Sequence, residues 1–156
     1  MTNSINQRSL YQQVILAHSK KPRHQGKTNP VHRYHRGHNP MCGDTIELTL
    51  ELNQTGDRIS DIKFEGQACA IAIASADLMA DAVRGKSLQE ALEMVQQFRD
   101  MMQGKAEFPI DVRKLNVLQG ISQFPIRIKC ATLGWHTLKA ALESSQVTAS
   151  TAESEE

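Results

Sequence analysis

The alternation of apolar and polar residues over residues 45–52 constrains the fold more than any other feature of the chain. Successive side chains of a β-strand point to opposite faces, so this alternation predicts a strand with one buried and one solvated face. Residues 53–57 have the composition of a turn, and residues 58–64 return with further apolar positions. We therefore predict a β-hairpin. The apolar residues of its second strand change phase once, which predicts a β-bulge near Ser60.

Helical patterns lie on both sides of this hairpin. Before it, residues 7–19 place apolar side chains at helical spacing. Pro22 ends that segment, because the residue before a proline is disfavoured in a helix. After the hairpin we predict three more helices, which are residues 70–83, a segment that opens at Ser87 with a capping box, and a segment that follows Pro125.

Two long connections separate these elements. Residues 105–124 read as a polar connection with one short helical turn, and residues 22–41 are rich in Gly, Pro and His. A lone hairpin is marginally stable, so we expect a third strand at residues 30–38. The order of elements predicts an α+β fold, a small antiparallel β-sheet of about three strands with helices packed on one face. We expect residues 1–143 to form a single domain and residues 144–156 a disordered C-terminal tail.

Length and composition limit the classes of protein that the chain can represent. Its 156 residues suit one domain, and 18 Lys and Arg against 17 Asp and Glu leave a net charge of +1, which gives no global basic field for nucleic acid. No apolar run approaches the ~20 residues that span a bilayer, and the polar start is not a secretory signal. Three cysteines, an odd number, do not suit a closed disulfide framework. We expect a cytoplasmic protein with no nucleic-acid or membrane partner, whose thiols are free or metal-bound.

The three cysteines all stand at the ends of predicted elements. Cys42 precedes the first strong strand, Cys69 lies between the second strand and a helix, and Cys130 lies in the first turns of the last helix. In extended backbone Cys42 and Asp44 point the same way. Together these four residues could form a tetrahedral zinc site, because thiolates favour zinc or iron–sulfur chemistry over magnesium or calcium. The simpler alternative is that each cysteine is a small buried apolar residue, and the spacing alone does not decide.

The histidines offer a rival ligand set. His32, His35 and His38 recur every third residue, but Pro30 and Gly37 argue against the helix that would align them, so a solvated loop is favoured. The basic segment over residues 20–36 contains a single aromatic residue, which favours a solvated or protein-docking surface over nucleic-acid binding. The chain has no serine-hydrolase order, phosphate-binding loop or dinucleotide motif.

Several segments of the chain match the motifs of a known family. They are residues 10–15 with the Lys-Pro-Arg that follows, 39–44 (Asn-Pro-Met-Cys-Gly-Asp), 64–69, 101–105 and 118–133. In these motifs the chain resembles the IscU-like family of iron–sulfur cluster assembly proteins. Within this family it resembles the SufU type, because it has an insert at roughly residues 102–122 and carries Lys129 where IscU scaffolds carry histidine.

The resemblance implies a zinc-dependent sulfurtransferase of the IscU/SufU fold. Such a protein takes persulfide sulfur from a SufS-type cysteine desulfurase and passes it to a SufBCD-type scaffold. Cys42 would be the catalytic sulfur acceptor, freed when a partner histidine replaces it on the metal. The implied zinc ligands are Cys42, Asp44, Cys69 and Cys130, with Arg127 and Lys129 in supporting positions.

Two alternatives to this function stay open at the level of sequence. One is a scaffold that assembles a transient 2Fe–2S cluster on the same three cysteines. The other is a zinc-stabilised interaction domain without transfer chemistry. The resemblance also implies that the first helix and the loop through His38 help to dock the desulfurase, although the histidine-rich stretch is a departure from the family.

Overall fold

The secondary structure begins with a helix, continues with three strands and then turns to helices. The structure is a computed structural model that describes residues 4–105, 107–144 and 153–154. In chain order the elements are α1 (Ser4–Lys20), β1 (Arg33–Asn39), β2 (Asp44–Leu52), β3 (Ile59–Glu65), α2 (Ala70–Val83), α3 (Leu88–Met102), the 3-10 helix η1 (Ile110–Gln123), α4 (Pro125–Glu143) and β4 (Glu153–Ser154). The predicted α+β fold is confirmed.

The sheet is antiparallel through its three long strands, with β2 between β1 and β3. The register of β2 and β3 shifts next to the turn that joins them. Glu51 pairs with Asp61, whereas Leu52 pairs with Ile59. Ser60 is therefore the additional residue of a β-bulge, and this prediction is confirmed. The third strand expected at residues 30–38 is confirmed as β1, so the connection after α1 is only partly irregular.

Two expectations about connecting segments need correction. The segment after residue 105 contains η1, a 3-10 helix of 14 residues rather than a short turn. The tail expected to be disordered contributes a two-residue strand, β4, which pairs in parallel with Arg36 and Gly37 of β1. Residues 145–152 and 155–156 of the predicted tail lie outside the described residues.

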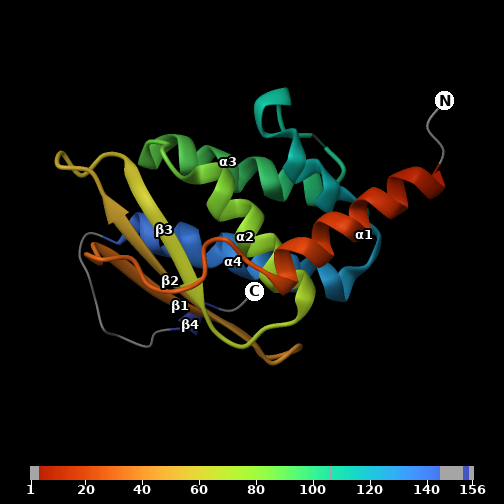
Figure 1. The fold of residues 1–156 in the computed structure, drawn as a ribbon, viewed down its shortest axis with the longest axis horizontal. Helices are drawn as coiled ribbons and strands as arrows, with labels where there is room; N and C mark the ends of the chain where they lie inside the picture. Colours follow the sequence, from red (N-terminus) through yellow and green to blue (C-terminus); the bar gives the residue numbers. More distant parts are fainter. Residues whose placement is uncertain (1–3, 106, 145–152, 155–156) are drawn as a thin grey trace.

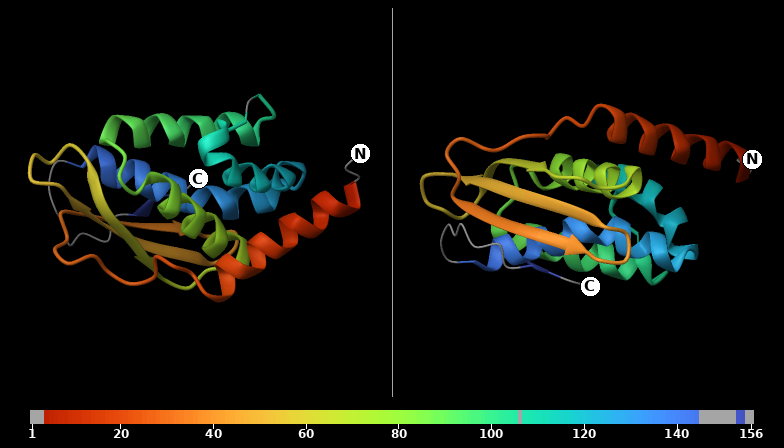
Figure 2. Two further views of the ribbon diagram at one scale, coloured as in Figure 1. Left: turned by 45° about the horizontal axis from the view of Figure 1, so that its top comes forward. Right: turned by 90° about the horizontal axis from the view of Figure 1, so that it is seen from below.

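The helices cover one face of the sheet in two layers (Figure 1). Helices α2 and α4 lie next to the sheet, and α3 packs beyond them, on the side away from the strands (Figure 2). No helix in the described part of the chain is long and apolar enough to cross a membrane. The buried apolar residues of β2 and β3 are Ile46, Leu48, Leu50, Leu52, Ile59, Ile62 and Phe64.

Helices α2 and α4 approach each other closely because small residues meet where they cross. A Cβ atom added to Gly134 would lie 3.1 Å from the Cβ of Ala76. Beside this contact the Ser75 hydroxyl donates to the carbonyl oxygen of Ala131 at 2.7 Å and accepts from the indole N–H of Trp135 at 3.1 Å. Ser75 and Trp135 are fully buried. The serine therefore satisfies the indole N–H inside the core and fixes how the two helices sit.

We predict that Ser75→Ala lowers the free energy of unfolding by about 1–3 kcal/mol, because the Trp135 N–H loses its buried partner. Urea denaturation followed by tryptophan fluorescence measures the change. Ser60→Ala is the matched control: it removes an exposed hydroxyl in the bulge and should change stability by no more than about 0.5 kcal/mol. Equal stability of the two variants would contradict the role of Ser75.

Candidate metal centre

The tight turn between β1 and β2 carries Cys42. Asn39 ends β1 and pairs with Asp44, the first residue of β2. The Asn39 carbonyl accepts hydrogen bonds from the N–H groups of Cys42 (3.3 Å) and Gly43 (2.9 Å). Gly43 has a φ of +73°, in the left-handed region where glycine is unstrained. The turn therefore holds Cys42 at the end of the sheet and starts β2 with a buried carboxylate.

Asp44 joins this turn to the start of α2. Its side chain is 3% exposed, and one carboxylate oxygen accepts the backbone N–H of Cys69 at 2.8 Å. The other oxygen accepts from the Cys69 thiol at 3.3 Å. Cys69 is the N-cap of α2, and its sulfur accepts from the N–H of Ala72 at 3.4 Å. Asp44 and Cys69, two of the four residues predicted to bind zinc, therefore lie in direct contact.

Gly66 allows this contact, although sequence reasoning gave it no role. Its φ is +140°, and a Cβ atom there would collide with the carbonyl oxygen of Thr45. The N–H of Thr45 donates to the carbonyl of Gln67 at 2.8 Å, so the loop before α2 lies against the first residues of β2. Only glycine permits this approach. The available signal was a glycine directly after a predicted strand, which often marks close backbone contact.

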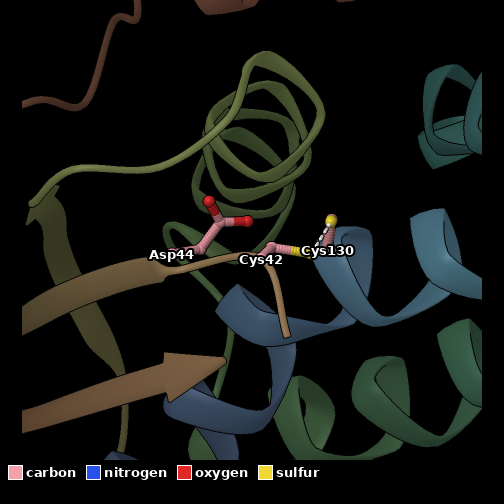
Figure 3. A group of neighbouring side chains, drawn as sticks. All are labelled: Cys42, Asp44 and Cys130. Carbon is pink, nitrogen blue, oxygen red and sulfur yellow. Dashed lines mark hydrogen bonds between the residues drawn. The ribbon is translucent and has the colours of Figure 1, made fainter. Parts of the chain in front are cut away.

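Cys130 reaches the same place from the first turns of α4. Pro125 opens this helix, where its lack of an N–H costs nothing, and Cys130 is 5% exposed. Its sulfur lies 2.7 Å from the sulfur of Cys42, and both thiols are free. Figure 3 shows Cys42 extending from its turn toward Cys130, with Asp44 alongside. Ligand atoms of Cys42, Asp44 and Cys130 all lie within 4.8 Å of one another.

The surroundings of Cys69 and Cys130 oppose ionisation of these two thiols. Burial raises the pKa of Cys130 strongly, and the hydrogen bond with Cys42 and the charge of Cys69 add to this effect. Partial burial likewise raises the pKa of Cys69, with a further contribution from Asp44, against the opposing hydrogen bond from Ala72. A divalent cation would supply the missing positive charge, because thiolates and carboxylates bind metal in their ionised form.

The donor set fits zinc. Thiolate ligands at about 2.3 Å from a tetrahedral zinc ion stand about 3.8 Å from one another. The Cys42 and Cys130 sulfurs are 2.7 Å apart, so these two side chains would have to separate by about 1 Å around an ion. Asp44 offers an oxygen within 4.8 Å of both sulfurs, and Cys69 is in contact with Asp44. Sulfur donors of this kind favour zinc or iron–sulfur clusters over magnesium or calcium. The four residues proposed from sequence therefore lie at one location, while their assignment as ligands stays a prediction.

Arg127 and Lys129 occupy the first turns of α4 before Cys130. Arg127 is exposed, and its guanidinium lies 4.9 Å from the centre of the Phe124 ring. Lys129 is half-buried. Their supporting roles at the metal stay predictions, since no described contact joins Arg127 to a ligand residue.

Exposed apolar side chains adjoin the site along the chain, and sequence reasoning missed them. Met41, next to Cys42, is 65% exposed. Phe124 and Ile126, at the start of α4, are 47% and 62% exposed. We call these three residues the apolar rim. Exposed apolar side chains gathered near a polar site are typical of surfaces that bind another protein.

The histidines of β1 do not form the rival ligand set. His32 accepts the backbone N–H of Leu52 at 2.8 Å, and the His38 ring lies 3.0 Å from the Thr45 hydroxyl. Burial lowers the pKa of His35. In the described part of the chain, the only group of three His, Cys, Asp or Glu side chains within metal-binding reach is that of Cys42, Asp44 and Cys130. The interpretation of this stretch as a solvated loop is wrong, because it lies in or next to a strand.

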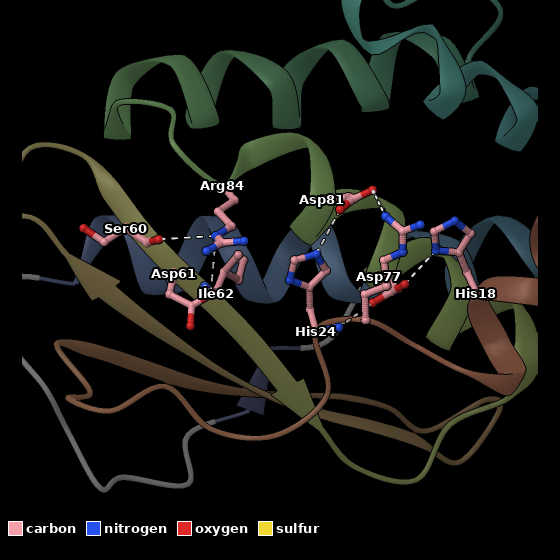
Figure 4. A network of polar contacts seen from close by, with 9 residues as sticks. His18, His24, Ser60, Asp61, Ile62, Asp77, Asp81 and Arg84 are labelled. Atoms are coloured by element: carbon pink, nitrogen blue, oxygen red, sulfur yellow. Dashed lines mark hydrogen bonds and ion pairs between the residues drawn. The ribbon is translucent and has the colours of Figure 1, made fainter.

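A separate polar network attaches α1 to α2 (Figure 4). The ring of His18 lies 2.6 Å from one oxygen of Asp77, and the backbone N–H of His24 donates to the other at 2.9 Å. The His24 ring lies 3.0 Å from Asp81. Partial burial opposes ionisation of Asp81, yet His24 and the nearby cations lower its pKa overall. His24 is buried, although it lies in the irregular segment between α1 and β1.

Comparison with known proteins agrees with this architecture. The model of the NifU-like N-terminal domain family matches residues 10–150. The chain belongs to this family. A zinc-dependent sulfurtransferase SufU of Bacillus subtilis is 46% identical over 140 residues, which cover 89% of this chain and 93% of that protein. An iron–sulfur cluster assembly scaffold protein IscU of Streptococcus pyogenes is 43% identical over 138 residues, 87% of this chain and 84% of that protein.

Solved structures show the same fold. The crystal structure of FiSufU from Fervidobacterium islandicum, a candidate assembly scaffold for the SUF system, is similar with a TM-score of 0.77 and 39% identity, over 83% of this chain and 94% of that one. A NifU-like N-terminal protein from Brucella abortus matches with a TM-score of 0.73 at 19% identity, over 83% of this chain and 89% of that one, which shows the fold alone. The chain is an iron–sulfur cluster assembly protein of the IscU/SufU family.

We predict that Gly66→Ala weakens zinc binding by about tenfold or more, because the collision with Thr45 moves Cys69 away from Asp44. Competition with a chromophoric zinc chelator measures the affinity. The matched control is Gly56→Ala, whose φ of +75° is also positive but where nothing lies within 4 Å of the added Cβ atom. The control should lose about 1 kcal/mol of stability and keep its zinc affinity. Equal zinc affinities in both variants would disprove the role of Gly66.

Proposed function

We propose that this protein is a zinc-dependent sulfurtransferase of iron–sulfur cluster biogenesis. It accepts persulfide sulfur from a SufS-type cysteine desulfurase on Cys42 and passes it to a SufBCD-type scaffold, in the cytoplasm. The observation that carries the proposal is the meeting of three thiols and one buried carboxylate at one end of the sheet. The similarity to the Bacillus subtilis sulfurtransferase supports it.

Cys42 is the thiol best placed to accept sulfur. Cys130 is buried within α4, and Cys69, although exposed, is held as a helix cap by its contacts with Asp44 and Ala72. Cys42 is half-buried but lies on a turn between two strands, and the space around its neighbour Gly43 is open. A partner's persulfide can therefore approach Cys42 without displacing an element of the fold.

The transfer needs no added oxidant or reductant. The Cys42 thiolate attacks the outer sulfur of the desulfurase persulfide, a new S–S bond forms on Cys42, and the desulfurase cysteine leaves as a thiolate. In the second step a thiolate of the scaffold attacks the outer sulfur on Cys42 and releases the Cys42 thiolate. When bound, zinc supplies the positive charge that keeps the thiols of the site deprotonated until a partner docks.

The apolar rim gives such a partner a surface to bind. Met41 adjoins the acceptor thiol along the chain, and Phe124 and Ile126 lie on the first residues of the helix that carries Cys130. Arg127, stacked over Phe124, adds a fixed positive charge. Aromatic residues, methionine and arginine are enriched in protein–protein interfaces. This composition supports docking of the desulfurase at the site itself.

The second candidate is a scaffold that assembles a 2Fe–2S cluster on the same cysteines, as the name of the Streptococcus pyogenes relative indicates. Lys129 disfavours it. A protonated lysine has no lone pair and cannot replace a histidine ligand, so the donor set is limited to the three thiols and Asp44. The insert that forms η1 is the second feature that favours the SufU type.

The metal content distinguishes the two candidates. We predict that protein purified without added metal contains about one zinc ion per chain and has no colour, because zinc has no visible absorption. Elemental analysis together with a visible spectrum tests this. Iron with labile sulfide and visible absorption would overturn the proposal in favour of the scaffold.

We predict that Cys42→Ser abolishes the gain of one sulfur atom that mass spectrometry detects after incubation with desulfurase and cysteine, because serine forms no persulfide. Asp44→Ala should lower both zinc content and desulfurase stimulation, because the site loses its carboxylate. Asp57→Ala, at an exposed hairpin turn, is the control and should change neither quantity. Full sulfur gain by Cys42→Ser would refute Cys42 as the acceptor, whereas no sulfur gain by either the wild type or the variant would favour the zinc-stabilised interaction domain.

A further inference from the structure

One buried amide contacts the sulfur of the acceptor cysteine. Asn39 is 3% exposed, and its side-chain N–H₂ group donates to the Cys42 sulfur at 3.5 Å. Its side-chain oxygen accepts the backbone N–H of Met41 at 3.1 Å. A backbone N–H bonds only to the oxygen of the amide, so this contact turns the nitrogen toward Cys42. The orientation of Asn39 is thus fixed by its own turn.

The side chain of Asn39 has a role separate from its backbone. The turn is closed by the Asn39 carbonyl, which accepts from the N–H groups of Cys42 and Gly43, and by the pairing of Asn39 with Asp44. These interactions do not use the side chain. A substitution that changes only the amide therefore leaves the backbone frame of the turn in place.

A hydrogen bond to sulfur is strongest when the sulfur is charged, because charge-assisted bonds are roughly twice as strong as neutral ones. The Asn39 N–H group therefore donates most strongly to the charged sulfur that attacks, and it holds that sulfur in a fixed direction. Groups that hydrogen-bond to metal ligands commonly tune their reactivity. Asn39 is not suited to bind metal through its oxygen, which Met41 already uses.

We propose that Asn39 is a positioning residue for sulfur transfer, which donates a hydrogen bond to the Cys42 thiolate and supports it as the nucleophile. This role rests on the proposed function. It needs no contact between Asn39 and the partner's persulfide, because the bond to Cys42 acts on the attacking atom. When Cys42 passes the sulfur on, it leaves as a thiolate, and the same hydrogen bond stabilises that thiolate.

Two substitutions separate an electrostatic role from a structural one. Asn39→Asp keeps the shape and the oxygen that accepts from Met41, but places a negative charge where the N–H group faced the sulfur. Asn39→Ala removes the donor without adding charge. If the amide acts on the thiolate, reactivity falls in the order wild type, Ala variant, Asp variant. A merely structural role gives the opposite order of the variants, because aspartate fills the same space.

The experiment measures two rates on each protein. The first is the initial rate of sulfur uptake from a SufS-type desulfurase by the zinc-loaded protein. The second is the rate at which iodoacetamide alkylates Cys42 in metal-free protein, followed by peptide mass spectrometry. We expect both rates to fall by about tenfold in Asn39→Asp and by less in Asn39→Ala. Zinc content should be unchanged in the Ala variant, and its melting temperature should fall slightly, because the Met41 N–H loses its acceptor.

Matched controls and outcomes make the test decisive. Asn53 lies in the other hairpin turn and also accepts backbone N–H groups through its side chain, so Asn53→Asp should leave both rates unchanged. Wild-type rates in both Asn39 variants, or an Asp variant faster than the Ala variant, would overturn the role of Asn39. Absence of sulfur uptake by wild type would instead refute the proposed function, while the alkylation rates still test the contact of Asn39 with Cys42.

Discussion

The close contact between α2 and α4 is the constraint on which the site depends. The two helices meet where Gly134 lies against Ala76, and Ser75 fastens them through the indole of Trp135. Cys69 caps one of these helices and Cys130 lies in the other. A larger residue at the crossing would separate the helices and with them the two thiols. Core packing, rather than a local ligand motif, therefore determines the distance between these donors.

A buried carboxylate adds a second constraint, one of charge. Asp44 is almost fully removed from water, and burying an ionised group is costly unless it is paired. Its oxygens accept hydrogen bonds from the N–H and the thiol of Cys69. Burial also raises the pKa values of Cys69 and Cys130, so the folded chain opposes ionisation of these thiols beside the carboxylate. A divalent cation relieves this imbalance, which explains why such a cluster suits zinc.

The residues of the site differ in how firmly the fold holds them. Asp44, Cys69 and Cys130 are attached to a strand, a helix cap and a helix interior. Cys42 belongs to a turn, where its position depends on hydrogen bonds with Asn39. For the sulfur transfer proposed above, Cys42 is therefore the donor whose release from the metal would disturb no helix or strand.

Sequence alone determined the elements whose signals are local: the alternating strand β2, the bulge at Ser60, the capping box at Ser87 and the helix after Pro125. It also singled out the four residues of the site. Other features depended on contacts between distant segments. Gly37 argued for a loop, yet it lies in β1, where a Cβ atom would collide with Thr137 of α4, so its lack of a side chain reflects close packing against a remote helix. The burial of His24, the role of Gly66 and the pairing of β4 likewise have no local pattern, because each depends on where a remote backbone or carboxylate lies after folding.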